Sequence, residues 1–161
     1  EICACLVGSE MCIRDSMYWS KDGNAEGMCK GPADMDDFRM KFDSLEEQQE
    51  DPDSIYNYVK QVIRVRNQNP VIARGTTAYL EQYSGEQCFA LTRSYEGSNL
   101  LLLGNTSAEA VSVDLTGLTV GGTTAEELVL LGELYTGEET AERAGTVVTL
   151  PAYSILILGE E

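Results

Sequence analysis

The sequence predicts a mainly β fold, in which an antiparallel β-sandwich follows a long irregular segment and one amphipathic helix. Three observations lead to this prediction. Apolar side chains recur at helical spacing in residues 51–70, and short apolar runs separated by glycine- and serine-containing turns occupy residues 76–158. Residues 17–50 show neither period. Short strands at hairpin-length intervals are typical of antiparallel sandwiches with Greek-key connections.

The helix expected at residues 51–70 has signals for both of its ends. Asp51 suits the N-cap and Pro52 the first helical position, whereas Pro70 stops a helix. The apolar residues that recur three and four positions apart are Ile55, Tyr58, Val59, Val62 and Ile63. A single helix cannot bury such a stripe alone. We therefore expect the helix to pack on the strands that follow or on a surface outside this chain.

Seven strands are expected after the helix. They cover residues 76–83, 87–95, 99–105, 110–115, 127–135, 146–150 and 154–158. Residues 88–91 and 100–103 are continuous apolar runs, which indicates burial on both faces of a sheet. In contrast, residues 111–115 alternate apolar and polar side chains, as a half-buried strand does.

The charge of the chain limits the classes of partner. The 161 residues carry 11 Lys and Arg against 27 Asp and Glu, a net charge of −16. Such a surface repels nucleic-acid backbones and anionic membranes, so neither is expected as a partner. No apolar run approaches the roughly 20 residues of a membrane span. The acidic residues are scattered through turns, which indicates a solvated surface rather than a cation site.

Metal and cofactor chemistry has few candidate residues here. The chain contains no histidine, which removes imidazole as a base or as a metal ligand. Its cysteines are Cys3, Cys5, Cys12, Cys29 and Cys88. Their spacing fits no zinc pair, and the odd number predicts no designed set of disulfides. We expect Cys88 to be a core residue, and we assign no metal site and no cofactor to this chain.

Residues 1–16 differ from the rest of the sequence. They hold three of the five cysteines and show no periodicity, and residues 7–16 resemble a translated sequencing-adapter tag. We expect a disordered, non-native segment here, joined to a protein that begins further upstream; a genuine short apolar segment is the alternative. The segment lacks a charged-then-apolar signal pattern. Any targeting signal is therefore expected outside this chain, and a cytoplasmic and a secreted parent both stay open.

Trp19 is the candidate site residue. It is the only tryptophan and begins the long connection over residues 17–50, which glycines and aspartates interrupt. A connection of this length is commonly functional. Trp19 either packs the loop on a neighbouring surface or offers an indole ring on which a sugar can stack.

Several short motifs occur in an order that resembles a known family. They are Trp19-Ser20, Glu46-Glu47-Gln48, Asp51-Pro52-Asp53-Ser54-Ile55, residues 62–66, residues 90–93, residues 104–107 and residues 150–154. Together they resemble the C-terminal part of the α-amylase family of glycoside hydrolases, over residues 17–158. The resemblance implies that residues 17–70 are the remnant of a catalytic (β/α)8 barrel, a loop plus the last helix. Residues 71–161 would be the sandwich called domain C.

The resemblance also implies a reaction for the parent enzyme. The family hydrolyses α-glucosidic bonds of starch-like glucans or maltooligosaccharides with retention, using one carboxylate as nucleophile and a second as proton donor. Those groups belong to barrel strands upstream, so we expect no catalytic residue in this chain and no activity of the chain alone. Glu46, Glu47 and Asp51 are better explained by the preference of helix starts for negative charge. The parent can hold Ca²⁺, but no site for it is identifiable here.

Two other classes of function stay open at this stage. A non-catalytic carbohydrate-binding sandwich requires exposed aromatic residues on one sheet face. The candidates are Tyr79, Tyr83, Tyr95, Tyr135 and Tyr153. Their spacing does not place them in one row. A structural or interaction domain unrelated to sugars is the third interpretation.

Overall fold

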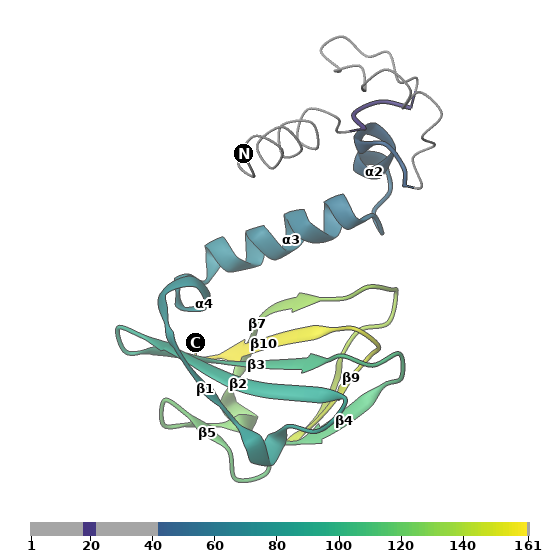
Figure 1. Ribbon diagram of the computed structural model, residues 1–161. Helices are drawn as coiled ribbons and strands as arrows, with labels where there is room; N and C mark the ends of the chain where they lie inside the picture. Colours follow the sequence, from purple (N-terminus) through teal and green to yellow (C-terminus); the bar gives the residue numbers. More distant parts are fainter. Residues whose placement is uncertain (1–17, 22–41, 161) are drawn as a thin grey trace, which may run out of the picture. The chain divides into compact units, whose positions relative to one another are not determined.

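The computed structural model describes residues 18–21 and 42–160 (Figure 1). The chain forms two compact units, Glu1–Asn57 and Tyr58–Glu161, and each is described by itself. The segment expected to be a tag, residues 1–16, lies outside the described residues. In the part that the structure describes, no helix is long and apolar enough to cross a membrane.

The helix boundaries differ from the expected ones. Helix α2 spans Leu45–Glu50, where an irregular connection was expected, and helix α3 spans Ile55–Gln68. Asp51 does not begin α3 but ends α2, because its backbone N–H donates to the Glu47 carbonyl at 3.1 Å. The prediction of a helix start at Pro52 was therefore wrong. Pro70 ends α3 as expected and also begins helix α4, Pro70–Arg74.

The second unit is an antiparallel β-sandwich, which confirms the expected fold class. Its strands are β1 Thr76–Tyr79, β2 Cys88–Tyr95, β3 Ser98–Asn105, β4 Val111–Asp114, β5 Thr119–Val120, β6 Thr123–Thr124, β7 Val129–Leu134, β8 Glu142–Ala144, β9 Val147–Leu150 and β10 Ile155–Gly159. One sheet has the order β1-β2-β3-β10-β7 and the other β4-β9-β8, while β5 and β6 form a separate hairpin. All paired strands are antiparallel.

Each expected strand has a counterpart, with differences at the ends and in the short elements. The first expected strand stops at Tyr79, and a short 3-10 helix, Glu81–Tyr83, follows it. Strands β5, β6 and β8 were not expected, because two or three residues are too few to show an apolar period. The alternation predicted for β4 is confirmed: Val113 is buried, whereas Ser112 and Asp114 are exposed.

Strand β3 connects the two hydrophobic layers. Leu101 and Leu103 belong to the core between the sheets, whereas Leu100 and Leu102 belong to a second cluster on the opposite face. The continuous run at residues 100–103 is therefore buried on both faces, as expected. The between-sheet core also contains buried residues of the partner sheet, among them Val113, Val148 and Leu150.

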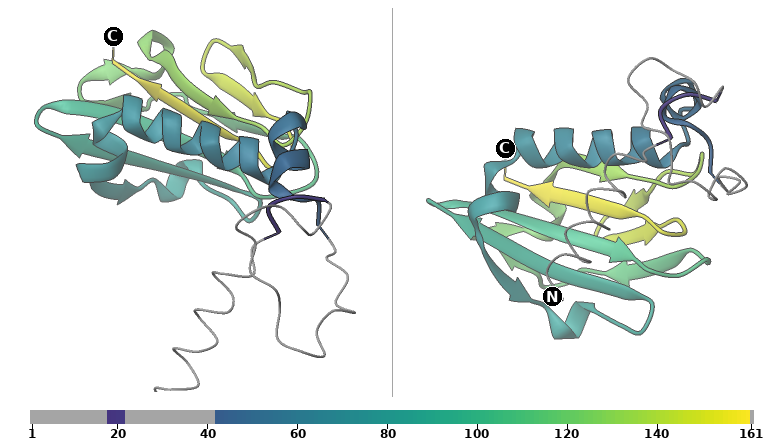
Figure 2. Two further views of the ribbon diagram at one scale, coloured as in Figure 1. Left: turned by 90° about the horizontal axis from the view of Figure 1, so that it is seen from above. Right: turned by 45° about the horizontal axis from the view of Figure 1, so that its top comes forward.

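The second cluster joins α3 and α4 to the five-stranded sheet. Its members from the helices are Tyr58, Val62, Val65, Val71 and Ile72, and its members from the sheet include Leu100, Leu134 and Ile157. Figure 2 shows α3 running across this face of the sheet. Gly132 in β7 allows the close approach, because a Cβ atom there would lie 2.8 Å from Cγ1 of Val65. The Gln61 side chain also donates to the Glu133 carbonyl at 3.1 Å.

Asn105 holds the two sheets together at one end of the sandwich. Its side chain is buried and donates to the carbonyls of Glu109 at 2.7 Å, Pro151 at 2.8 Å and Leu150 at 3.2 Å. Its carboxamide oxygen accepts from the backbone N–H and the hydroxyl of Ser107, at 2.9 and 2.8 Å. One buried amide thus connects the loop after β3, the end of β9 and the turn that follows β9.

We predict that Asn105→Ala is strongly destabilising. The replacement leaves buried carbonyls without a donor, and each such loss costs about 1–3 kcal/mol, so we expect a fall of about 2–4 kcal/mol in the free energy of unfolding. Urea titration monitored by circular dichroism measures it. Asn67→Ala is the matched control, because Asn67 is exposed on α3; it should change stability by about 0.5 kcal/mol or less. Equal midpoints for the two variants would contradict the assigned role of Asn105.

Candidate functional site

Trp19 lies where two segments that are distant in sequence meet. The backbone N–H of Leu45 donates to the Tyr18 carbonyl at 2.9 Å, and the N–H of Glu46 donates to the Trp19 carbonyl at 3.2 Å. Residues 18–21 therefore pair with the first turn of α2. This turn has N–H groups without partners inside the helix, and the two carbonyls satisfy two of them.

The indole ring of Trp19 is accessible. Trp19 is 42% exposed, while the next residue, Ser20, is buried. The Tyr18 hydroxyl donates to the Lys21 carbonyl at 2.9 Å and closes a small turn around Trp19. The structure thus places Trp19 on a fixed backbone with an exposed ring, a geometry compatible with stacking on a ligand.

Ser44 and Glu47 form a capping box at the start of α2. The Glu47 carboxylate accepts from the Ser44 N–H at 3.0 Å and from its hydroxyl at 2.8 Å, and Ser44 is fully buried. The other carboxylate oxygen contacts the Lys21 ammonium at 2.9 Å. The hydrogen bond from Lys21, followed by those from Ser44, lowers the pKa of Glu47 to about 2. Helix α2 was not expected from the sequence, although the spacing of Ser44 and Glu47 is a known start signal of helices.

A dense set of hydrogen bonds fixes the corner between α2 and α3. The Asn57 carboxamide donates to the carbonyls of Gln48 at 2.9 Å and Asp51 at 2.7 Å. The Gln48 side chain accepts from the Tyr56 N–H at 3.2 Å, and the Ser54 hydroxyl accepts from the Asn57 N–H at 3.2 Å. The motif around Asp51 that contributed to the resemblance thus builds a helix corner, and Asp51 takes part through its backbone and as a local acceptor for Asp53.

Helix α3 has apolar side chains on two faces. Tyr58, Val62 and Val65 pack toward the five-stranded sheet. The other apolar residues form a second row: Ile55 is 75% exposed, Val59 46% and Ile63 51%. This row lies at four-residue spacing and hence on one side of the helix. The stripe expected from the sequence is therefore covered along one edge, by the sheet, and exposed along the adjoining edge. We call Ile55, Val59 and Ile63 the outer face of α3.

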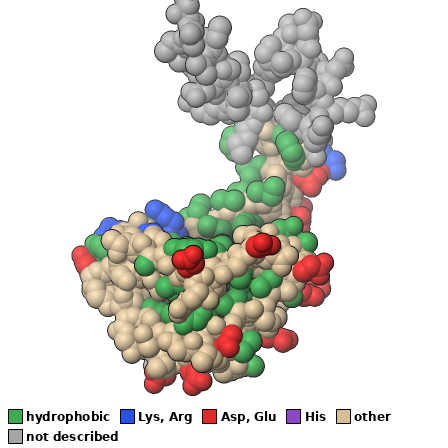
Figure 3. Space-filling view, turned by 60° about the horizontal axis from the view of Figure 1, so that its bottom comes forward, with side chains coloured by type: hydrophobic (Ala, Val, Ile, Leu, Met, Phe, Trp, Pro, Cys, Tyr) green, Lys and Arg blue, Asp and Glu red, His purple; other side chains and the backbone are tan. Residues whose placement is uncertain are grey.

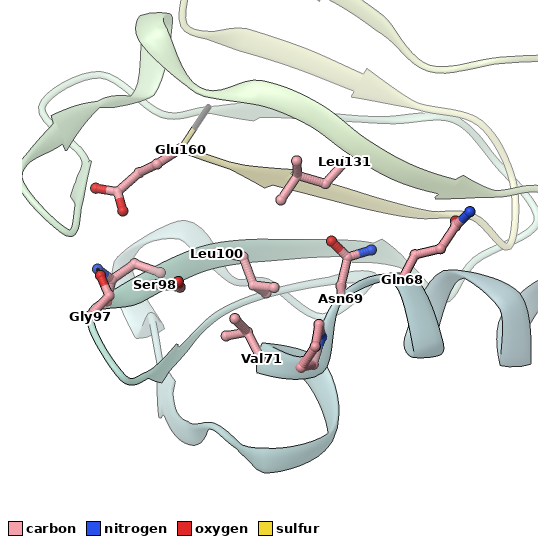
Figure 4. Close-up of a pocket in the computed structure, with 10 residues that line it drawn as sticks. Gln68, Asn69, Val71, Gly97, Ser98, Leu100, Leu131 and Glu160 are labelled. Atoms are coloured by element: carbon pink, nitrogen blue, oxygen red, sulfur yellow. Dashed lines mark hydrogen bonds between the residues drawn. The ribbon is translucent and has the colours of Figure 1, made fainter.

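A groove lies where α3, α4 and the ends of β3 and β10 meet. It has a volume of about 320 Å³ and is lined by residues that include Gln68, Asn69, Leu100, Leu131 and Glu160. In Figure 4 the apolar side chains line its middle, with the Glu160 carboxylate at one end and the two carboxamides at the other. Oxygen Oε1 of Glu160 accepts from Thr123 at 3.1 Å, so this carboxylate already has a structural partner.

A second groove, of about 450 Å³, is more acidic. Glu138, Glu139 and Glu142 line it together with Thr140 and Thr149. These carboxylates are exposed, and Figure 3 shows acidic side chains at several places on one face of the molecule. Within the described residues, no group of three or more acidic or cysteine side chains is arranged to hold a metal ion.

The five candidate tyrosines do not form a binding row. Tyr79 and Tyr153 are exposed, at 61% and 52%, but they lie on β1 and in the turn before β10. Tyr83 donates to the Thr116 carbonyl at 3.2 Å, and Tyr135 donates to Glu133 at 2.7 Å. Burial and the neighbouring Glu133 raise the pKa of Tyr135 to about 12. Tyr95 lies beside the Arg74 guanidinium, 6.0 Å from the ring centre.

Comparison with known proteins gives a clear structural relationship. No family model matches the sequence, and no curated protein matches it. Among solved structures, Eubacterium rectale Amy13B is 38% identical over 90% of this chain, with a TM-score of 0.79. An α-amylase from H. orenii is 22% identical over 89% of the chain, with a TM-score of 0.57. A trehalulose synthase MutB variant is also 22% identical over 89%, with a TM-score of 0.65.

The relationship covers nearly the whole chain but only part of each relative. The chain spans 27% of Amy13B, 25% of the H. orenii α-amylase and 24% of the MutB variant. The two relatives of lower identity show the fold alone, whereas the identity to Amy13B includes the sequence. With the ordered motifs and the sandwich, this evidence establishes that the chain belongs to the α-amylase family of glycoside hydrolases.

Proposed function

We propose that this chain forms the last barrel helix and domain C of an α-amylase-type glycosidase. In this proposal residues 17–70 belong to the catalytic barrel, and residues 71–161 are the sandwich domain. The parent hydrolyses α-glucosidic bonds of starch-like glucans or maltooligosaccharides with retention of configuration. The observation that carries the proposal is the uncovered apolar outer face of α3.

Burial of the outer face against a partner layer is energetically favourable. Burying one such aliphatic side chain contributes roughly 1.5–3 kcal/mol, so Ile55, Val59 and Ile63 together favour a covering surface by several kcal/mol. The adjoining row of apolar side chains on α3 already packs on the sandwich. A helix whose apolar stripe is wider than one layer covers is typical of an element between two layers. The eighth helix of a (β/α)8 barrel that also carries domain C occupies such a position.

The described carboxylates support a structural role for this chain. Where their pKa is shifted, at Glu47, Asp114 and Glu127, it is lowered by hydrogen bonds from Lys21 or from Ser and Thr neighbours. A glycosidase proton donor requires the opposite shift, because it must hold its proton near neutral pH. In this proposal the catalytic carboxylates lie in the barrel of the parent, and the chain alone hydrolyses no glucan.

Trp19 is the one residue of this chain that we assign to the substrate. Its ring is 42% exposed, and hydrogen bonds to α2 fix the backbone that carries it. In the parent this segment follows the eighth barrel strand, at the face where barrel enzymes place their active sites. We assign Trp19 a stacking contact with a glucosyl unit.

A carbohydrate-binding sandwich is the second candidate function, supported by the exposed Tyr79 and Tyr153. The observed positions favour it less, because the two rings lie on separate elements and the other three candidates contact protein groups. Titration of the chain with soluble starch or cyclodextrin, followed by calorimetry, discriminates between the two functions. Saturable binding that Tyr79→Ala or Tyr153→Ala abolishes would favour the second candidate.

The outer face of α3 can be tested in a chimera. Residues 18–161 replace the aligned 27% of Amy13B, and hydrolysis of maltooligosaccharides is measured. We expect an active chimera, because the outer face meets the barrel of a related enzyme. Ile63→Glu should lower the yield of folded, active enzyme at least about tenfold, since a charge buried without a partner costs several kcal/mol.

The matched control is Val147→Glu, which places the same charge at an exposed valine of the second sheet, 38% exposed. This variant should keep nearly full activity. If Ile63→Glu and Val147→Glu are equally active, the outer face is not an interface and the proposed position of the chain is wrong.

The role of Trp19 has a separate test in the same chimera. Trp19→Ala should lower kcat/KM for maltooligosaccharides about tenfold, which corresponds to about 1.4 kcal/mol of lost transition-state binding. Trp19→Phe should retain most activity because it keeps an aromatic face. The yield and thermal stability of both variants provide the control for folding. Unchanged kcat/KM in Trp19→Ala would remove Trp19 from the substrate site.

A further inference from the structure

Three side chains at the start of α2 and in the segment of Trp19 are linked through one carboxylate. The Lys21 ammonium lies 2.9 Å from one oxygen of Glu47, and the other oxygen accepts from both the backbone N–H and the hydroxyl of Ser44. Lys21 is two residues after Trp19, whereas Ser44 and Glu47 lie at the start of α2. One carboxylate therefore links the segment that carries the indole to the helix against which that segment pairs. We call Lys21, Ser44 and Glu47 the clasp.

The backbone hydrogen bonds between the segment and α2 end at Trp19. They join Tyr18 to Leu45 and Trp19 to Glu46, through one hydrogen bond each. The clasp adds a third connection, from Lys21, two residues after Trp19, to Glu47, the residue after Glu46. Three successive connections fix the direction of residues 18–21 as well as their position.

The small contribution of an exposed ion pair indicates that the clasp affects the position of residues 18–21 rather than the global stability of the protein. The Lys21 side chain is 75% exposed and that of Glu47 33% exposed. Exposed ion pairs shift an equilibrium by at most about fivefold, too little to hold a domain together. A shift of that size is sufficient to select one arrangement of a short surface segment.

We propose that Lys21, Ser44 and Glu47 are positioning residues, which hold the Trp19 ring in the orientation required for contact with the sugar. The inference rests on the proposed function for the identity of that ligand. The clasp itself consists of contacts within this chain. Of the other titratable groups near it, Tyr18 and Asp43 act on the charge of Lys21, and Glu46 is the exposed neighbour of Glu47 in α2.

The fluorescence of the 161-residue chain tests the clasp directly, because Trp19 is its only tryptophan. We measure emission maximum, anisotropy and acrylamide quenching for the unmodified chain and for Lys21→Met, which removes the ammonium and leaves the capping box intact. We expect lower anisotropy and a quenching constant raised about two- to fivefold, the range that an exposed ion pair can produce. Glu47→Gln should show the same change or a larger one.

Glu50→Gln is the matched control, because it makes the same replacement at an exposed position of α2. It should leave the Trp19 signal unchanged. Glu47→Asp, which keeps the charge, should restore part of the signal lost in Glu47→Gln. A merely structural role of Glu47 would not produce this order, provided that the melting temperature of the sandwich is equal in all variants.

The pH profile adds an independent readout. The lowered pKa of Glu47 means that the carboxylate stays charged well below the ordinary range near 4.3, so the folded clasp is favoured above that range and is lost as the pH falls toward about 2. The quenching of Trp19 should therefore stay constant from pH 7 to about pH 4 in the unmodified chain.

A Trp19 signal that is identical in the unmodified chain, Lys21→Met and Glu47→Gln would overturn the inference. So would a fluorescence change in the unmodified chain with a midpoint near pH 4.3. Neither measurement involves sugar, whereas the Trp19→Ala chimera does. A clasp that is confirmed by fluorescence and a Trp19→Ala chimera with full activity would together refute only the assigned sugar contact.

Discussion

The close packing of α3 on the five-stranded sheet is the constraint on which the rest of the second unit depends. Val65 reaches the sheet because residue 132 is glycine, and a Cβ atom at that position would lie 2.8 Å from Cγ1 of Val65. This approach buries Leu100, Leu134 and Ile157 on the side of the sheet that faces away from the sandwich core. The sheet is consequently apolar on both sides, and α3 has one apolar side left. This exposed apolar side is the observation on which the proposed place of the chain in a larger enzyme rests.

The hydrogen bonds of the first unit have a complementary role. Hydrogen bonds of Asn57, Ser54 and Gln48 connect the start of α3 to the end of α2. The N–H groups in the first turn of α2 donate to the carbonyls of Tyr18 and Trp19. The polar motifs that resemble the family thus set helix ends and a corner, and none of them brings together a catalytic pair. Their contribution is geometric, because they fix the ends of α2 and α3 and the backbone of Tyr18 and Trp19.

The sequence was sufficient to predict the sandwich, because its strands alternate or bury apolar residues over four or more positions. Runs such as residues 100–103 leave few other structures possible. It was insufficient for β5, β6 and β8, whose two or three residues are held by pairing with neighbours rather than by their own pattern. Helix α2 was within reach through the spacing of Ser44 and Glu47. The division of the α3 stripe into a covered and an exposed row was not, because the spacing of apolar residues in the helix does not show which of them meet the sheet.

The candidate site could be predicted only in part. Trp19 stood out as the only tryptophan, in a polar loop. The α2 residues that contact its segment, Glu46 and Glu47, are more than 20 residues away in the sequence and meet the segment only through folding. The order of short motifs predicted the family, and the similarity to Amy13B agrees with it. The reaction could not be assigned in the same way, because the described residues do not form a catalytic site.

Amide hydrogen exchange tests the central claim, that α3 is a layer shared between the sandwich and a second surface. Exchange rates of residues 58–68 are compared between the chain alone and the chimera with Amy13B, with β3 and β10 as internal reference. The account predicts that α3 exchanges clearly more slowly in the chimera while the reference strands keep their rates. Equal protection of α3 in both proteins would show that its outer face acquires no partner, and would contradict the account.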